Sequence, residues 1–177
     1  MSPRVLVAGI GNIFFSDDGF GCEVASRLVK MPVPEGVEVE DYGIRGVHLA
    51  YQLLEGYDAL VIIDAMPMGD EPPGTVVVLE PDPPPPSAES DDIEAVMDGH
   101  TMSPGTVLRT LTNLGGSVGR ILVVGCQPAT IEEGMGLSDS VAAAVDGAVE
   151  VVSELLTEVV SELLTDVCQP AGRETRT

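Results

Sequence analysis

Residues 9 to 21 read Gly9-Ile-Gly-Asn-Ile-Phe-Phe-Ser-Asp-Asp-Gly-Phe-Gly21, and they follow directly on the apolar run Val5 to Ala8. A strand that leads into closely spaced glycines is typical of a nucleotide site, where bare backbone N–H groups and a helix N-terminus receive phosphate. A dinucleotide fingerprint needs a third glycine where this chain has Phe14, however, and Asp17 and Asp18 would repel a pyrophosphate. The stretch therefore predicts an α/β fold whose first loop presents carboxylates at the carboxyl end of a strand.

Strands and helices alternate along the rest of the chain. The apolar run Ala59 to Ile63, which ends in Asp64, is typical of a central strand covered on both faces. The turn from this run to Thr75–Leu79 is too short for a crossover helix, so Thr75–Leu79 is predicted to run antiparallel to its predecessor. The other predicted strands are Val5 to Ala8, Val37 to Asp41 and Arg120 to Val124, and the predicted helices are Gly19 to Lys30, Gly46 to Leu54, one opening at Ser103-Pro104 and a long one from about Ser138. The pattern predicts a three-layer α/β/α fold with a five-stranded mixed sheet in which one strand is antiparallel.

Composition limits the number of domains and the class of partner. With 177 residues, 44% of them hydrophobic, and a mean hydropathy of +0.25, the chain can bury one substantial core. A net charge of −21 with only 8 Lys and Arg residues argues against binding to nucleic acid or to an anionic membrane. No apolar stretch approaches the length of a membrane span, and Met1 to Arg4 lead into a strand without a signal segment. We therefore expect a cytoplasmic protein.

The three cysteines indicate neither a disulfide framework nor a metal site. Cys22, Cys126 and Cys168 are far apart and show no C-x-x-C spacing, so neither a disulfide set nor a thiolate zinc site is indicated. We expect them to be reduced, and we expect Cys126 to be a small buried residue rather than a nucleophile.

Two segments depart from the alternation of strands and helices. The stretch from Glu80 to Gly99 carries four consecutive prolines and several acidic residues, which predicts a surface excursion. Residues 151 to 158 are repeated almost unchanged as residues 159 to 166. Eight residues turn an ideal helix by about 80° beyond two full turns, so the two copies cannot face the core identically, and the second is predicted to be a dispensable extension. We expect one domain over residues 1–166 and a disordered or extended tail over 167–177.

Candidate functional residues stand at the ends of three predicted elements. Asp18 follows the first strand, Asp64 ends the third, and His100 precedes the helix that opens at Ser103. The ends of adjacent parallel strands meet at one edge of a sheet, so we expect these side chains to gather there. Two carboxylates and one imidazole form a ligand set suited to nickel, zinc, cobalt or iron, and three protein ligands leave positions open for a substrate atom or water.

The same residues also have ordinary structural interpretations, which their spacing leaves open. Asp64 can cap the turn after its strand, and Asp18 can cap the next helix and interact with its dipole. His100 can be a loop histidine without a ligand. Ligands that are far apart in sequence carry no local pattern, so spacing alone does not decide between these interpretations.

Four segments together resemble the hydrogenase maturation endopeptidases. They are Gly9-x-Gly-Asn-x-x-x-x-Asp-Asp-Gly-x-Gly21, the strand ending in Asp64-Ala65, His100 followed by Ser103-Pro104, and Gly125-Cys-Gln-Pro128 with Gly136-Leu-Ser138. The resemblance spans about Val5 to Val149, and the combination is more specific than any single motif. The chain departs from the family pattern at Asp18, where some members have Glu, at Gln127-Pro128, where Glu-Pro is frequent, and near Ile44, where Thr is common.

This resemblance implies a function, a site and a partner. Members of the family remove a short C-terminal peptide from the large-subunit precursor of nickel–iron hydrogenase once nickel has been inserted. Asp18, Asp64 and His100 match the family's nickel-sensing positions, which implies that they are both the metal ligands and the catalytic residues. The nickel would belong to the precursor and would bridge to these side chains on docking, so cleavage would depend on prior metal loading.

A non-catalytic nickel-binding or carrier module of hydrogenase maturation is the alternative function. A high-affinity carrier is expected to use more His or Cys than this chain offers, since it has 2 His and no clustered thiols. A nucleotide-binding protein would need the first glycine loop to accept phosphate, which Asp17 and Asp18 oppose. The peptidase function is therefore the one we expect.

Overall fold

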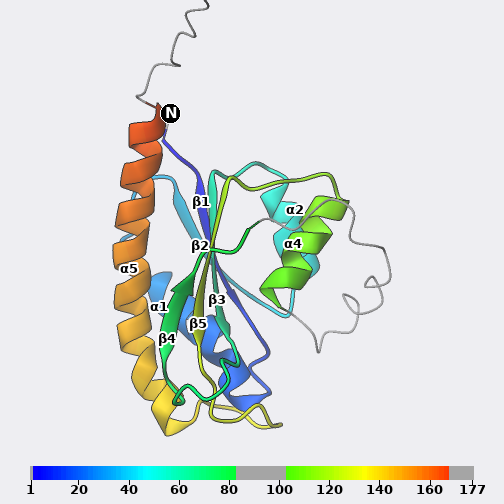
Figure 1. The fold of residues 1–177 in the computed structure, drawn as a ribbon, viewed down its shortest axis with the longest axis vertical. Coiled ribbons are helices and arrows are strands. Elements are labelled where there is room, and N and C mark those ends of the chain that lie inside the picture. Colours follow the sequence, from blue (N-terminus) through cyan, green and yellow to red (C-terminus); the bar gives the residue numbers. More distant parts are fainter. Residues whose placement is uncertain (1, 83–102, 168–177) are drawn as a thin grey trace, which may run out of the picture.

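The computed structural model describes residues 2–82 and 103–167, which form three layers around one sheet (Figure 1). Five strands make the sheet in the order β2-β1-β3-β5-β4. Their bounds are β1 Val5–Ile10, β2 Val37–Gly43, β3 Ala59–Ala65, β4 Val76–Leu79 and β5 Arg120–Cys126. The first four strands of that order are parallel to their neighbours, and β4 pairs antiparallel with β5. The predicted five-stranded mixed sheet with one antiparallel strand is confirmed.

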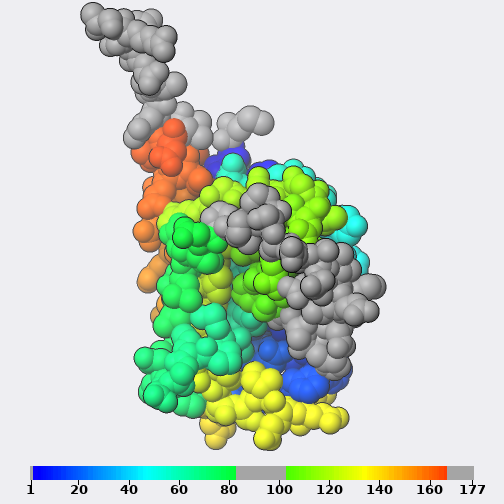
Figure 2. All heavy atoms as spheres, turned by 45° about the vertical axis from the view of Figure 1, so that its right-hand side comes forward, coloured from blue at the N-terminus to red at the C-terminus, as the bar shows by residue number. Residues whose placement is uncertain are grey.

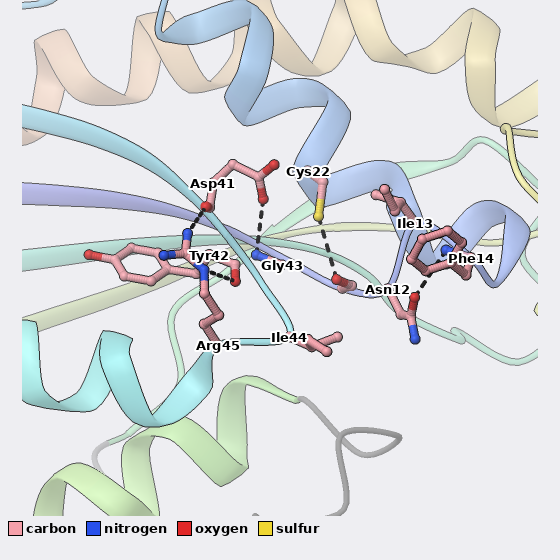
Figure 3. Close-up of a pocket in the computed structure, with 10 residues that line it drawn as sticks. Asn12, Ile13, Phe14, Cys22, Asp41, Tyr42, Gly43, Ile44 and Arg45 are labelled. Carbon is pink, nitrogen blue, oxygen red and sulfur yellow. Dashed lines mark hydrogen bonds between the residues drawn. The ribbon is translucent and has the colours of Figure 1, made fainter.

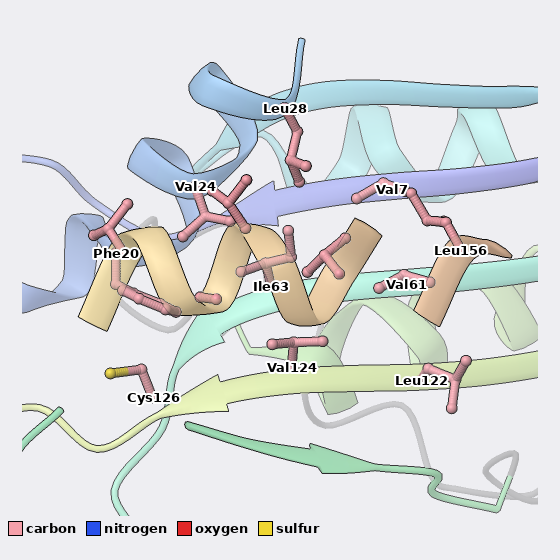
Figure 4. Packing of buried hydrophobic residues seen from close by; sticks show 14 of the residues in the cluster. Val7, Phe20, Val24, Leu28, Val61, Ile63, Leu122, Val124, Cys126 and Leu156 are labelled. Atoms are coloured by element: carbon pink, nitrogen blue, oxygen red, sulfur yellow. The ribbon is translucent and has the colours of Figure 1, made fainter. Parts of the chain in front are cut away.

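Helices cover both faces of the sheet. One face packs against α1 (Phe20–Leu28) and α5 (Asp139–Val167), and the other against α2 (Gly46–Leu53) and α4 (Pro104–Asn113). Alternate residues of the central strands serve the two cores. In β1, for example, Val5 and Val7 contribute to the first core, whereas Leu6 and Ala8 contribute to the second. Figure 4 shows Val61, Ile63 and Val124 of the other strands in the first core. Burial on both faces explains why these strands are apolar throughout.

The antiparallel strand β4 lies at an edge of the sheet. It runs antiparallel to β3, as the short connection predicted, but β5 lies between the two strands. The connection passes over the end of β5, where the backbone N–H of Met66 donates to the carbonyl of Cys126 at 2.8 Å and the N–H of Gly74 donates to the carbonyl of Gln127 at 2.9 Å. These bonds hold the connection at the carboxyl end of β5.

The repeated octapeptide lies within α5. Val152 and Leu156 of the first copy are buried, whereas Leu164, the counterpart of Leu156 in the second copy, is 47% exposed. The two copies therefore present different faces to the core, as the helical rotation predicted. The second copy is not a spare extension, however, because Val159 is fully buried in the same core. The helix α5 ends at Val167.

Several predictions concern residues that the structure does not describe. The part of the predicted excursion after Asp82 lies outside the described residues. His100, Cys168 and the rest of the predicted tail lie outside them as well. Cys22 and Cys126 are buried free thiols. Within residues 2–82 and 103–167, no helix combines the length and the apolar character that crossing a membrane requires.

Candidate active site

The loop after β1 folds back on itself and brings Asp18 to the carboxyl end of the sheet. Asp18 Oδ2 accepts the backbone N–H of Asn12 at 2.7 Å, and Asn12 Oδ1 accepts the N–H of Phe14 at 3.0 Å. A Cβ at Gly11, whose φ is +132°, would lie 1.9 Å from the carbonyl oxygen of Asp18. Only glycine permits this turn, because the backbone is left-handed and another chain segment occupies the space of a side chain.

A second glycine places the following helix against the sheet. Asp18 lies in the short 3-10 helix η1 (Ser16–Gly19), and α1 follows directly. A Cβ at Gly21 would lie 2.1 Å from the carbonyl oxygen of Ile63 and 2.5 Å from that of Ile10. The glycines of the opening stretch therefore serve a tight turn and close helix–strand packing, and this packing sets η1 beside the end of β3.

Asp64 is buried at the end of β3 without full hydrogen bonding. The residue is 5% exposed, and its Oδ1 has no hydrogen-bond partner in the part of the chain that the structure describes. Burial and the negative charge of Asp18 raise the pKa of Asp64 well above its usual range, against the opposing effect of the Ala65 N–H. Burial also raises the pKa of Asp18, although the N–H of Asn12 opposes it. Two carboxylates whose ionisation burial disfavours, one of them with an oxygen that no group in residues 2–82 and 103–167 binds, form a site that a divalent cation would neutralise.

The structure thus brings two of the three predicted site residues together. His100 lies outside the described residues, so its place relative to Asp18 and Asp64 stays a prediction. Among residues 2–82 and 103–167, no three His, Cys, Asp or Glu side chains form a group able to hold a metal ion. The capping interpretation of Asp18 is not supported, because the N-cap of α1 is Gly19 and no side chain caps that helix end.

Asp17 has a role that the sequence did not reveal. It is fully buried, and its carboxylate accepts the backbone N–H groups of Ala129 (2.8 Å), Thr130 (3.1 Å) and Ser138 (2.7 Å), together with the hydroxyl of Ser138 (2.8 Å). Burial acts to raise the pKa of Asp17, but these donors outweigh it and lower the pKa below the usual range. Asp17 therefore stays ionised and ties the loop after β1 to the loop after β5 and to the start of α5.

A pocket opens beside Asp18, between the loop after β1 and the turn from β2 to α2 (Figure 3). Its volume is about 320 Å³. The residues that line it are Gly11, Asn12, Ile13, Phe14, Cys22, Asp41, Tyr42, Gly43, Ile44 and Arg45. The Cys22 thiol donates a hydrogen bond to the Gly11 carbonyl at 3.5 Å, and burial, followed by the charges of Asp41, Asp18 and Asp64, raises its pKa. The pocket and the two site carboxylates are therefore neighbours.

The loop after β5 borders the same region. The backbone N–H of Ser16 donates to the carbonyl of Gly134 at 2.8 Å, and the N–H of Gly134 donates to the carbonyl of Phe14 at 2.8 Å. In Figure 2 this loop, in yellow, lies against the loop after β1, in blue, at the lower end of the molecule. Loops from the carboxyl ends of β1, β2 and β5 thus lie at the same end of the sheet as the two carboxylates, where open α/β sheets place their sites.

Comparisons with known proteins agree on one family. A family model described as hydrogenase maturation protease matches residues 22–155. The hydrogenase expression/formation protein HupD of Rhodobacter capsulatus is 34% identical over 160 residues, which cover 86% of this chain and 71% of that protein. The hydrogenase 2 maturation protease of Escherichia coli is 30% identical over 154 residues, which cover 84% of this chain and 88% of that protein.

A solved structure agrees with these sequence comparisons. The hydrogenase maturating endopeptidase HybD from Escherichia coli matches with a TM-score of 0.68 and 28% identity, over 88% of this chain and 93% of that one. The resemblance noted in the sequence is therefore confirmed. This chain belongs to the hydrogenase maturation protease family and is a hydrolase that acts on peptide bonds.

Proposed function

We propose that this protein removes the C-terminal extension of a nickel–iron hydrogenase large-subunit precursor after nickel insertion, and that Asp18, Asp64 and His100 bind the nickel of that substrate. The observation that carries the proposal is the buried Oδ1 of Asp64 beside Asp18, which has no hydrogen-bond partner among residues 2–82 and 103–167. A buried acceptor without a donor costs free energy that a metal ion on the docked substrate would recover.

The electrostatics of the pair support a dependence on metal loading. Without a cation, burial disfavours the ionisation of both carboxylates, and the charge of Asp18 adds to the cost at Asp64. A nickel-free precursor offers no positive charge to offset this cost. A nickel-loaded precursor supplies the positive charge, so the two carboxylates ionise and hold the segment that carries the scissile bond. Binding energy from the metal is thus spent on positioning the peptide for hydrolysis.

Cleavage of two precursor preparations tests this proposal. The protein is incubated with nickel-loaded and with nickel-free large-subunit precursor, and the products are weighed by mass spectrometry. We expect cleavage of the loaded precursor alone. Asp18→Asn, Asp64→Asn and His100→Ala should each lower the rate by about 100-fold or more, since losing one ligand weakens a metal site at least as much as losing an outer partner does.

Two exposed residues outside the site provide matched controls. Asp70→Asn and His48→Ala remove a carboxylate and an imidazole from exposed positions, and both should cleave at the parental rate. Circular dichroism checks that every variant keeps its fold. Parental activity in any one of the three site variants would remove that residue from the site, and equal cleavage of nickel-free precursor would contradict the metal dependence.

Calorimetry of nickel against the free protein gives an independent check. Two carboxylates and one imidazole form an open site, so the remaining ligands must come from the substrate, and we expect weak binding to the free protein. Tight, stoichiometric binding by the free protein would favour an ordinary metalloprotease with a resident ion.

A further inference from the structure

We infer that the outer edge of β4 binds the C-terminal extension of the precursor as an added strand of the sheet. This inference rests on the proposed function, and it names the surface that holds the extension beyond the scissile bond. Within residues 2–82 and 103–167, β4 pairs with β5 on one side and with no strand on the other. Figure 2 shows β4, in green, on the surface of the molecule.

Half of the backbone groups of β4 point away from the sheet. The carbonyl of Thr75 accepts the N–H of Gln127 at 2.9 Å, which fixes the phase of the pairing with β5. Hydrogen-bonded and non-hydrogen-bonded pairs alternate in antiparallel strands, so Val77 bonds to β5. The N–H and carbonyl groups of Val76 and Val78 then face outward. A row of such donors and acceptors is the chemistry that binds an extended peptide.

The side chains of β4 also favour pairing. All four residues of the strand are apolar, and Val78 and Leu79 are 42% and 45% exposed. Sheet edges that stay free in solution usually carry charged side chains or proline, which prevent pairing with another chain. Glu80, which follows the strand, is neutralised by Arg120, with 2.8 Å between Oε1 and Nε. The strand therefore suits another extended segment beside it.

The edge lies in line with Asp64. Asp64 pairs with Gly125 of β5, and Gly125 pairs with Val77 of β4, so the three residues form one row across the sheet. Neighbouring strands are about 4.8 Å apart, so a strand added beyond β4 would lie about 14 Å from β3, a distance that about four extended residues cover. Because β4 starts at the end of the sheet that holds the carboxylates and runs away from them, an extension that leaves the site lies parallel to β4.

A second copy of this chain fits the edge less well. Each copy carries a net charge of −21, so two copies repel each other. Pairing over four residues is also small beside the roughly 1,000 Å² that a stable interface buries. A substrate segment is already held at the site, so a short pairing at the edge adds to an existing contact.

Kinetics with nickel-loaded precursor test the inference. Val78→Pro removes an outward N–H and leaves the bonds to β5, since edge strands accept proline where the N–H faces solvent. We expect KM to rise about tenfold and kcat to stay within about twofold. Val78→Thr keeps the N–H and the branched shape, so it is the matched control and its KM should be parental. Urea denaturation checks that both variants keep the fold.

A shortened precursor tests the inference without a change in the protein. Its extension ends four residues beyond the scissile bond, so the segment that would pair with β4 is missing. KM should rise by the same factor, and Val78→Pro should then have no further effect. Parental KM for both Val78→Pro and the shortened precursor would overturn the inference.

Photo-crosslinking identifies the occupant directly. A photoreactive phenylalanine analogue in place of Leu79 should give adducts within the extension of the nickel-loaded precursor. Adducts confined to the rest of the precursor, or to a second copy of this protein, would overturn the inference. The proposed function fails separately, if nickel-free precursor is cleaved at the parental rate.

Discussion

Replacing Asp17 by alanine should destabilise the protein severely, because Asp17 is fully buried and holds three segments of the chain together. Its carboxylate satisfies four donors at 2.7 to 3.1 Å, and it is fully buried. In Asp17→Ala the N–H groups of Ala129, Thr130 and Ser138 and the hydroxyl of Ser138 all lose their acceptor. The loops after β1 and β5 then lose the charge that holds them together.

The size of the effect follows from that arrangement. A hydrogen bond to a charged group contributes about 1.5–3 kcal/mol, but bonds that share one carboxylate do not add. Removing one partner from a buried charged network costs about 3–5 kcal/mol, and we expect a loss of this size in the free energy of unfolding. For a chain of this length the melting temperature should fall by about 6–20 °C. Asp17→Asn keeps one acceptor oxygen and should lose less.

Urea denaturation followed by circular dichroism measures the loss, with Asp70→Ala as the exposed control, expected within about 0.5 kcal/mol of the parent. The pKa of Asp17 is lowered on folding, so its stabilisation is present above the usual carboxyl pKa and disappears as pH falls through the lowered value. The difference between parent and Asp17→Ala should therefore shrink in acid. A loss below about 1 kcal/mol at neutral pH would refute the reasoning.

Three further predictions follow from the site and from α5. Asp64→Asn should abolish cleavage yet raise the free energy of unfolding at neutral pH by about 1–3 kcal/mol, because it removes the cost of a buried charge; a less stable variant would contradict this. The pKa of Asp64 is raised on folding, so that gain should fade as pH drops through the raised value, and cleavage by the parent should slow over the same range. Val159→Ala should cost about 1–3 kcal/mol by urea denaturation and Leu164→Ala less than about 0.5, whereas equal losses would show that the second octapeptide does not reach the core.

The fold could be predicted from the sequence because each element has its own periodicity. Runs such as Ala59 to Ile63 are apolar at every position, and this alone indicates a strand covered on both faces. The order of the strands in the sheet could not be predicted in the same way. Nothing in the apolar run at Arg120 to Val124 says that it inserts between β3 and β4, because an apolar strand fits beside many neighbours. Burial of Val159 does not follow from helical rotation alone, because the extent of the core that α5 covers also decides which of its residues are buried.

The site could be predicted only in part. Asp17 and Asp18 are chemically equal in the sequence, and only the turn of η1 separates them. A 3-10 helix has about three residues per turn, so adjacent side chains point about 120° apart, one toward Ser138 and the other toward Asn12. The pocket has no local signal in the sequence either, since its two sides, around Phe14 and Ile44, come from segments far apart in the chain.

The direction of α5 decides where residues added to this helix would lie. The helix starts beside Asp17. Its later residues Leu163 and Asp166 border Arg4 and Asp58, which lie at the amino ends of β1 and β3, opposite the carboxylates. Added turns therefore accumulate away from the carboxylates. Each copy of eight residues also rotates its valines by about 80°, so a third copy would turn them about 160° from the first, toward solvent. Further copies of eight residues would therefore add no apolar surface to the core. An insertion of seven or eleven residues would instead keep a continuous apolar stripe along the helix.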